Sequence, residues 1–223
     1  MRIVAFGDLH GKVASIDPIC ARSEKADLTI VAGDITSFGS PGQAERIVAR
    51  VRGHAMRVLA IAGNCDSRAI SDRLDEMGVG IHAKGQVIQG IGFFGVGGSG
   101  NTPFNTPFEL AEIETERALR LGLSEVSGVA RRVLVSHAPP WGTGLDVVRS
   151  GQHAGNRAVR RFIEEEQPDL VLCGHIHESA GVDHLGATTI VNLGPARDGC
   201  YAIIDIGVEI AIRQLDSSSR EPS

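Results

Sequence analysis

The chain is organised around short runs of apolar residues that end directly in polar side chains. Five of these runs are nearly continuous in apolar residues, which is typical of strands that are buried on both faces of a sheet. They are Arg2–Phe6, Asp27–Ala32, Arg57–Ala62, Arg132–Ser136 and Asp169–Cys173. We predict that all five are β-strands.

Helical spacing of apolar residues separates several of these runs. Ala44, Ile47, Val48 and Val51 recur at the i, i+3, i+4 and i+7 positions that share one helix face. Shorter versions of the pattern occur at Ile70, Leu74 and Met77, at Leu110, Ile113 and Leu121, and at Val159, Phe162 and Ile163. Because strands and helices alternate in the first third of the chain, we predict right-handed parallel strand–helix–strand units there.

The second half of the chain has a different pattern, with strand-like runs joined by short turns. Antiparallel hairpins are predicted from Gln86–Gln89 with Gly92–Val96, and from Ala187–Val191, Cys200–Ile206 and Val208–Gln214 at the end of the chain. Together these elements predict an α/β fold of four layers, α-β-β-α, in which two packed mixed β-sheets are flanked by helices.

Composition sets the remaining limits. The 223 residues carry a net charge of −5, which argues against a long nucleic acid as partner, and no apolar run is long enough to span a membrane. We expect one domain over residues 1–216 and a flexible polar tail over 217–223. The strand that begins at Arg2 leaves no room for a signal peptide, and the four cysteines have no CxxC spacing. These features predict a cytoplasmic protein with reduced thiols.

The most informative residues follow the predicted strands at the point where each strand ends. They are Asp8, His10, Asp34, Asn64, His137, His175 and His177. In α/β sheets, ligands bind outside the carboxyl ends of the strands, and the neighbouring glycines allow the sharp turns that bring such side chains together. Two carboxylates, one amide and four imidazoles exceed the needs of one divalent ion, so we predict two ions of the Mn, Fe, Zn or Co type.

In their order, these motifs resemble the calcineurin-like metallophosphoesterase superfamily, and most closely its small Icc-related type. The resemblance is carried by Gly7-Asp8-x-His10-Gly11, Gly33-Asp34, Gly63-Asn64, His137 and Gly174-His175-x-His177. It implies that one ion, with Mn²⁺ favoured, is held by Asp8, His10 and His177, that a second is held by Asn64, His137 and His175, and that Asp34 bridges both. A hydroxide between the two ions would attack phosphorus in line with the leaving group.

The sequence departs from the family pattern at one position. Many members carry a histidine after the asparagine, where it protonates the leaving group or grips phosphate, whereas this chain has Cys65 in an Asn-Cys-Asp variant. This change favours substrates with acidic leaving groups and leaves the identity of the general acid open. We take His153 as the candidate acid, beside Asp34, Asn64 and His137 as the other catalytic residues.

Substrate contacts are less well defined by the sequence. Asn64, Trp141 and Arg197 are the candidate substrate-binding residues, although Trp141 fits a packing role equally well and an exposed arginine is the default for Arg197. Asp66 is either a support for the metal ligands or the N-cap of a helix over 67–77. We expect a phosphodiesterase acting on a small phosphodiester or a nucleotide, and a homo-oligomer is compatible with the sequence. The alternatives are a phosphomonoesterase or nucleotidase and a non-catalytic metal-binding scaffold for protein interaction.

Overall fold

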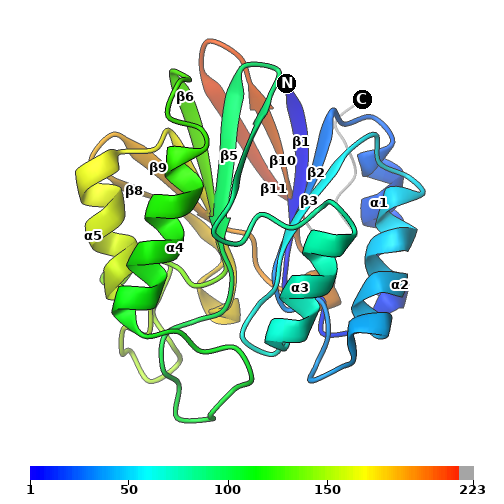
Figure 1. Cartoon of the computed structure of the whole chain (residues 1–223), viewed down its shortest axis with the longest axis horizontal. Helices are drawn as coiled ribbons and strands as arrows, with labels where there is room; N and C mark the ends of the chain where they lie inside the picture. Colours follow the sequence, from blue (N-terminus) through cyan, green and yellow to red (C-terminus); the bar gives the residue numbers. More distant parts are fainter. Residues whose placement is uncertain (216–223) are drawn as a thin grey trace.

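The computed structural model describes residues 1–215, which form two β-sheets packed face to face (Figure 1). The first sheet has the strand order β11-β10-β1-β2-β3. Its strands are β1 (Arg2–Phe6), β2 (Leu28–Ala32), β3 (Val58–Ile61), β10 (Tyr201–Ile206) and β11 (Ile210–Leu215). Strands β1, β2 and β3 are parallel, whereas β10 runs antiparallel to both β1 and β11.

The second sheet has the strand order β4-β5-β6-β7-β9-β8. Its strands are β4 (Gly85–Ile88), β5 (Ile91–Val96), β6 (Arg131–Ser136), β7 (Leu170–Cys173), β8 (Gly181–Leu185) and β9 (Thr188–Asn192). The four central strands are parallel, and the edge strands β4 and β8 are antiparallel to their neighbours. The parallel strands of both sheets therefore end on the same side of the molecule, at the bottom of Figure 1.

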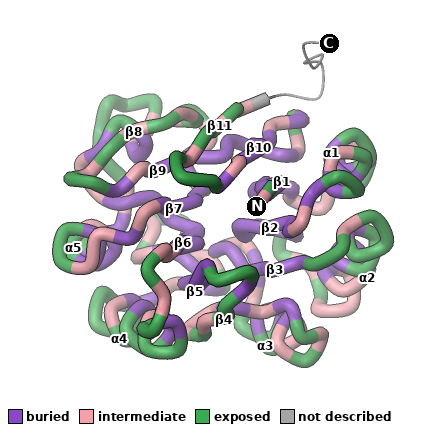
Figure 2. Tube along the Cα trace, turned by 90° about the horizontal axis from the view of Figure 1, so that it is seen from above, coloured by how far each residue is buried: buried purple, intermediate pink, exposed green. Residues whose placement is uncertain are grey.

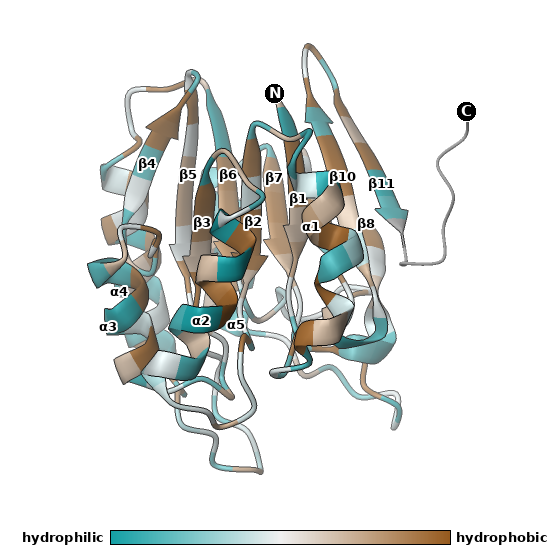
Figure 3. Ribbon diagram, turned by 90° about the vertical axis from the view of Figure 1, so that its right-hand side faces the viewer, coloured by the Kyte–Doolittle hydropathy of each residue, from teal (hydrophilic) through white to brown (hydrophobic). Residues whose placement is uncertain are grey.

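Helices form the two outer layers. The first sheet is covered by α1 (Asp17–Ser23), α2 (Pro41–Arg52) and α3 (Arg68–Glu76), and the second by α4 (Glu112–Ser124) and α5 (Arg157–Glu166) (Figure 1). In α2 the buried side chains are all apolar, namely Ala44, Ile47, Val48 and Val51, and Figure 3 shows hydrophilic residues on the outer side of this helix. Three short 3₁₀ helices, Val13–Ser15, His177–Ser179 and Ala196–Asp198, lie in the connecting loops.

The core has two parts because successive strand residues point to opposite faces of a sheet. In β1, Ile3 and Ala5 belong to the apolar cluster between the two sheets, while Val4 and Phe6 belong to the cluster on the helix side. Burial of both faces explains why the central strands are nearly continuous in apolar residues, and Figure 2 shows the buried strands enclosed by the more exposed helices. This packing holds the strand ends, and the residues that follow them, in fixed positions.

The predicted four-layer α/β sandwich is confirmed. The prediction for the end of the chain was wrong in one respect, because the first of the three closing strands, β9, does not form a hairpin with β10. It pairs with β7 and β8 in the second sheet, whereas β10 pairs with β1 in the first. The sequence analysis also missed the short helix α1 and the edge strand β8, whose alternating polar residues give a weaker signal than a buried strand.

Two predictions concern the ends and the surroundings of the chain. The predicted tail over 217–223, like residue 216, lies outside the described residues. Within residues 1–215, no helix is both long enough and apolar enough to cross a membrane.

Candidate metal centre

The seven polar residues that follow the parallel strands lie together at one end of the two sheets. The side chains of Asp8, His10 and His177 place one ligand atom each within 4.8 Å of one another, and so do those of Asp8, Asp34 and His137. The His137 Nε2 atom lies 2.9 Å from Asn64 Oδ1, and the rings of His137 and His175 are 5.2 Å apart between centroids. The structure thus brings all seven predicted ligand residues into one cluster, to which each sheet contributes.

The loops that carry these residues are held in an unusual backbone conformation. Asp8, His10, Asp34 and His175 all have positive φ angles, between 47° and 67°. Residues other than glycine adopt this left-handed region at a cost of about 1–3 kcal/mol each, and such strain concentrates at functional sites. Backbone hydrogen bonds stabilise the conformation, since the amides of Asp8 and His10 donate to the carbonyls of Gly33 (2.9 Å) and Asp34 (2.8 Å).

Glycines leave the space that the clustered side chains need. A Cβ atom on Gly33 would lie 2.4 Å from His137 Nδ1, and one on Gly174 would lie 2.2 Å from an Asp8 carboxylate oxygen. Each of these glycines precedes one ligand residue and makes room for a different one. The Gly-Asp, Gly-Asn and Gly-His pairs of the sequence therefore reflect close packing between strand ends as well as tight turns.

His137 shows that the donor set fits a cation. Its Nδ1–H group donates to the Ala32 carbonyl at 2.9 Å, so in the neutral ring the Nε2 atom carries a lone pair. This Nε2 atom faces two oxygens, Asn64 Oδ1 at 2.9 Å and Asp34 Oδ1 at 3.5 Å. Three electron-pair donors that face one another need a proton or a metal ion between them. The nitrogen and oxygen donors of this cluster therefore suit a borderline divalent metal ion.

The charges in the cluster support the same interpretation. Burial raises the pKa of Asp34, and the neighbouring charge of Asp8 adds to the rise against the attraction of His137. Burial also raises the pKa of Asp8, but its hydrogen bond from His177 and the nearby imidazoles outweigh this and lower it. Burial lowers the pKa of His137, yet the two carboxylates more than compensate, so that it is raised. The part of the cluster around Asp34 and His137 thus favours added positive charge.

His175 has a pKa shift in the opposite direction, which predicts a pH effect on stability. Burial, followed by the charge on His137, lowers its pKa from 6.5 to about 3. Between these values the unfolded chain binds a proton that the folded chain does not, so stability falls as the pH drops. Between pH 6.5 and 4, we expect the free energy of unfolding of the metal-free protein to fall by about 1–2 kcal/mol more than that of His175→Asn. This is less than the pKa shift alone would give, because the His175 ring lines a cavity where solvent screens its charge.

Urea unfolding of both proteins at stepwise pH values measures this difference. Parallel curves of unfolding free energy against pH would show that His175 titrates normally in the folded chain.

Asp66 supports the cluster from beneath. Its buried carboxylate accepts hydrogen bonds from the amides of Ile35 (2.9 Å), Thr36 (2.8 Å) and Gly63 (2.9 Å), and from the Thr36 hydroxyl (2.8 Å). These bonds join the segment after Asp34 to the segment before Asn64. Of the two roles considered for Asp66, the structure favours this support, because Ser67 occupies the N-cap position of α3.

Replacing Asp66 by alanine is expected to lower the free energy of unfolding by about 3 kcal/mol or more. The change leaves three buried amide donors without their acceptor, and each such loss typically costs about 1–3 kcal/mol. Chemical denaturation measures the effect. Asp72→Ala, which removes an exposed carboxylate from α3, is the matched control and should change stability by no more than about 0.5 kcal/mol. Equal losses in the two variants would contradict the supporting role of Asp66.

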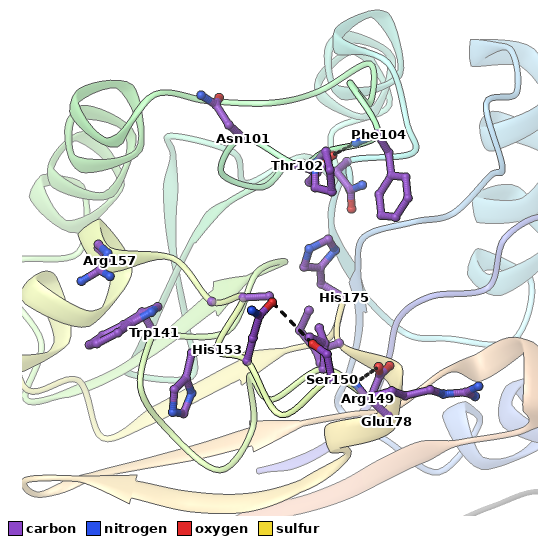
Figure 4. A pocket seen from close by; sticks show the side chains of 17 residues that line it. Asn101, Thr102, Phe104, Trp141, Arg149, Ser150, His153, Arg157, His175 and Glu178 are labelled. Carbon is purple, nitrogen blue, oxygen red and sulfur yellow. Dashed lines mark hydrogen bonds between the residues drawn. The ribbon is translucent and has the colours of Figure 1, made fainter.

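A cavity of about 780 Å³ adjoins the cluster (Figure 4). Asn64 and His175 line its inner part, and the outer walls are formed by residues 101–104, the loop over 148–155, and Trp141. The Arg157 guanidinium lies over the Trp141 ring, 3.9 Å from its centroid. One face of Trp141 is therefore already covered, which limits the predicted stacking role of this residue.

The other two candidate residues occupy different places. Arg197 lies at the cluster, with Nη2 at 3.2 Å from His177 Nδ1. His153 lies on the cavity wall, where its Nδ1 atom is 2.7 Å from the buried carboxylate of Asp146. In Figure 4 its ring is beside Trp141 and points away from His175. The structure thus places Arg197 with the metal-ligand candidates but does not bring His153 among them.

Sequence reasoning missed one carboxylate that organises this region, Asp146, and left the role of another, Asp66, open. Asp146 accepts hydrogen bonds from the amides of Gly142, Thr143 and Gly155, each at 3.0 Å, and thereby shapes the loop that carries His153. Asp66 was considered only as one of two alternatives. Neither residue follows a strand directly as the ligands do, so the sequence held no comparable signal for their contacts with distant backbone amides.

The fold and the cluster together define an α/β sandwich protein with a candidate dinuclear metal centre at the carboxyl ends of its parallel strands. The chain belongs to the calcineurin-like phosphoesterase family, whose model matches residues 1–179. The matched region contains all seven cluster residues, from Asp8 to His177. The resemblance inferred from the motifs is therefore confirmed.

The similarity to individual proteins covers 87% or more of this chain. The uncharacterized protein MJ1162 of Methanocaldococcus jannaschii is 39% identical over 201 residues, which cover 87% of this chain and 88% of that protein. The crystal structure of TT1561 of Thermus thermophilus has a TM-score of 0.75 at 18% identity, covering 97% and 98% of the two chains. A dimetal phosphatase from Danio rerio has a TM-score of 0.66 at 12% identity, covering 97% and 96%. At these identities the two structures show a shared fold.

Proposed function

We propose that the protein is a phosphodiesterase that uses two divalent metal ions, with Mn²⁺ favoured. The observation that carries this proposal is the convergence of seven metal-ligand candidates in a family of phosphoesterases. Asp8, His10 and His177 would hold one ion, and Asn64, His137 and His175 the other, with Asp34 between them. When bound, the two ions would activate a water molecule and neutralise charge on the phosphoryl oxygens.

The surrounding residues would position the substrate. The Asn64 amide lies at the inner end of the cavity, where it can also contact a phosphoryl oxygen. Arg197, beside His177, would add a positive charge that attracts the phosphate. Buried carboxylates and imidazoles keep the cluster rigid, so little reorganisation is needed when the phosphate binds.

The environment of Cys65 favours substrates with acidic leaving groups, and among these we propose diesters. Burial raises the pKa of this thiol, and the charge of Asp34 raises it further, so the thiol stays neutral and is a weak acid. His153 points away from the cluster, which leaves no well-placed imidazole acid on that wall of the cavity. Diesters with acidic leaving groups depend least on a general acid, because the departing oxygen is stable without a proton.

The direct test compares bis(p-nitrophenyl) phosphate with p-nitrophenyl phosphate after the metal-free protein is loaded with Mn²⁺. We expect a higher kcat/KM for the diester and a rise in melting temperature on addition of the metal, because the metal binds only the folded chain. A higher kcat/KM for the monoester would favour the phosphomonoesterase or nucleotidase alternative. A metal-induced rise in melting temperature without hydrolysis of either ester would favour the scaffold alternative.

The same assay examines His153. If this residue supplies the leaving-group proton, His153→Gln should slow an alkyl-leaving-group diester by about 10²-fold while sparing an aryl one. From the position of the ring, we expect less than about a threefold change for both esters. Selective loss of activity on the alkyl ester would restore His153 as the general acid.

A further inference from the structure

The distribution of aromatic side chains points to a feature of the substrate. The chain has seven phenylalanines, one tyrosine and one tryptophan. Six of these nine residues are fully buried in the core: Phe6, Phe93, Phe94, Phe108, Phe162 and Tyr201. The other three, Phe38, Phe104 and Trp141, all lie in loops at the end of the sheets that carries the metal-ligand candidates. No exposed aromatic ring occurs elsewhere in residues 1–215.

Phe104 is the most exposed of the three, at 82% of its full accessible surface. It lines the cavity, and Figure 4 shows it near His175 on the opposite side of the cavity from Trp141. Phe38 is 65% exposed, and its amide donates to the Cys65 carbonyl at 3.1 Å, next to Asn64 in the chain. Both phenylalanines therefore flank the candidate metal centre.

The turn that carries Phe104 is held in place by hydrogen bonds. The Glu109 carboxylate accepts from the Thr102 hydroxyl (2.6 Å) and from both the amide and the hydroxyl of Thr106 (2.8 Å each). The Thr102 hydroxyl in turn accepts from the Phe104 amide at 3.2 Å. Because the backbone is already ordered, a ligand that packs on the Phe104 ring would lose little affinity to ordering of the loop.

The free aromatic surface of the cavity belongs to Phe104. Trp141 is covered on one face by the Arg157 guanidinium, and the His153 ring lies 5.6 Å from it between centroids. Trp141 thus forms a packed wall, while the Phe104 ring faces open space. Asn101 also lines the cavity, and its amide can form hydrogen bonds with the edge of a base.

We propose that Phe104 is a specificity-determining residue that stacks on the nucleobase of a nucleotide substrate. The proposal rests on the proposed function, since the metal centre would hold the phosphate of the same molecule. The cavity of about 780 Å³ is much larger than one phosphate requires and lies within the usual range for small-molecule sites. Stacking on an aromatic ring gives affinity for a nucleobase whichever of the bases it is, because every base has a flat aromatic face.

The test is a binding comparison that does not depend on turnover. Adenosine 5′-monophosphate and ribose 5-phosphate share the sugar and the phosphate and differ in the base. In calorimetric titrations of the Mn²⁺-loaded protein, we expect the nucleotide to bind about tenfold more tightly. In Phe104→Leu, which keeps an apolar side chain but removes the ring, this ratio should fall to about threefold or less with unchanged affinity for ribose 5-phosphate. Trp141, the sole tryptophan, gives an independent fluorescence signal of cavity occupancy.

Met56→Ala is the matched control, because Met56 is 84% exposed and precedes β3 at the end of the sheet opposite to the cluster. It should retain the parent's preference. An unchanged ratio in Phe104→Leu, equal affinities in the parent, or no binding of either ligand would overturn the proposal. The proposal would also be overturned if the parent were a dimer that Phe104→Leu dissociates while the preference for the nucleotide stays intact. The Phe104 ring would then belong to a contact between two copies of the chain. A preserved nucleotide preference without hydrolysis of any phosphodiester would instead overturn the proposed function alone.

Discussion

Replacing Asp34 by asparagine is expected to reduce phosphodiester hydrolysis by about 10³-fold while making the metal-free protein more stable. Asparagine has the same shape and can keep the hydrogen bond from the Cys65 amide, which is 2.8 Å long. It lacks the charge that would hold both ions, so catalysis should be lost. The pKa of Asp34 is raised by burial and by Asp8, which means that ionised Asp34 destabilises the folded chain at neutral pH. Removing this charge should therefore increase the free energy of unfolding.

The opposite signs of the two effects separate a metal-bridging role from a merely structural one. Steady-state kinetics with Mn²⁺ and urea unfolding in the presence of a chelator measure them on the same preparations. Asp72→Asn, at an exposed position of α3, should change neither quantity appreciably. If Asp34→Asn kept the parent's activity, the proposed role of Asp34 as the ligand shared by both metal ions would be contradicted.

Replacing Gly63 by alanine is expected to abolish most activity through a single added methyl group. A Cβ at this position would lie 2.1 Å from Asp34 Oδ1 and 2.2 Å from the Asp34 amide nitrogen. Because the second contact is with backbone, a change of rotamer cannot relieve the clash. The Asp34 loop must move, and we expect a loss of about 1–3 kcal/mol in the free energy of unfolding together with a loss of activity of about a hundredfold or more.

Gly128→Ala provides the matched comparison. A Cβ on Gly128 would meet no atom within 4 Å, and the residue lies in the exposed connection between α4 and β6. Its replacement should leave kcat/KM unchanged. A Gly63→Ala protein with parental activity and metal affinity would show that the strand ends are more tolerant of displacement than the packing indicates.

The architecture and the cluster were predictable because both depend on local signals. Arg2–Phe6 and similar runs indicate buried strands, and a polar residue directly after each strand must lie at the carboxyl end of the sheet. Parallel strands place those ends on the same side, so Asp8, Asp34 and His137 were expected to meet. Edge strand β8 lacks such a signal. The separation of β9 from β10 depends on the pairing of β9 with β7 and on the pairing of β10 with β1, which lies at the other end of the chain.

Supporting residues were less predictable because their roles arise from contacts between distant segments. Asp66 acts through amides about thirty positions earlier in the chain, and Glu109 fixes the turn that presents Phe104. In the sequence these carboxylates look like any others on loops.

By itself, the sequence determined the α/β class, the family and the identities of the seven metal-ligand candidates. This was possible because a run of apolar residues indicates a buried strand, and the polar residues that end up at the strand's carboxyl end follow it directly in the sequence. Only the tertiary structure decided how those side chains face one another, which glycines make room for them, and which aromatic ring stays open to the cavity. These properties depend on distances of a few ångströms between segments far apart in the chain, and they follow from how the two sheets pack.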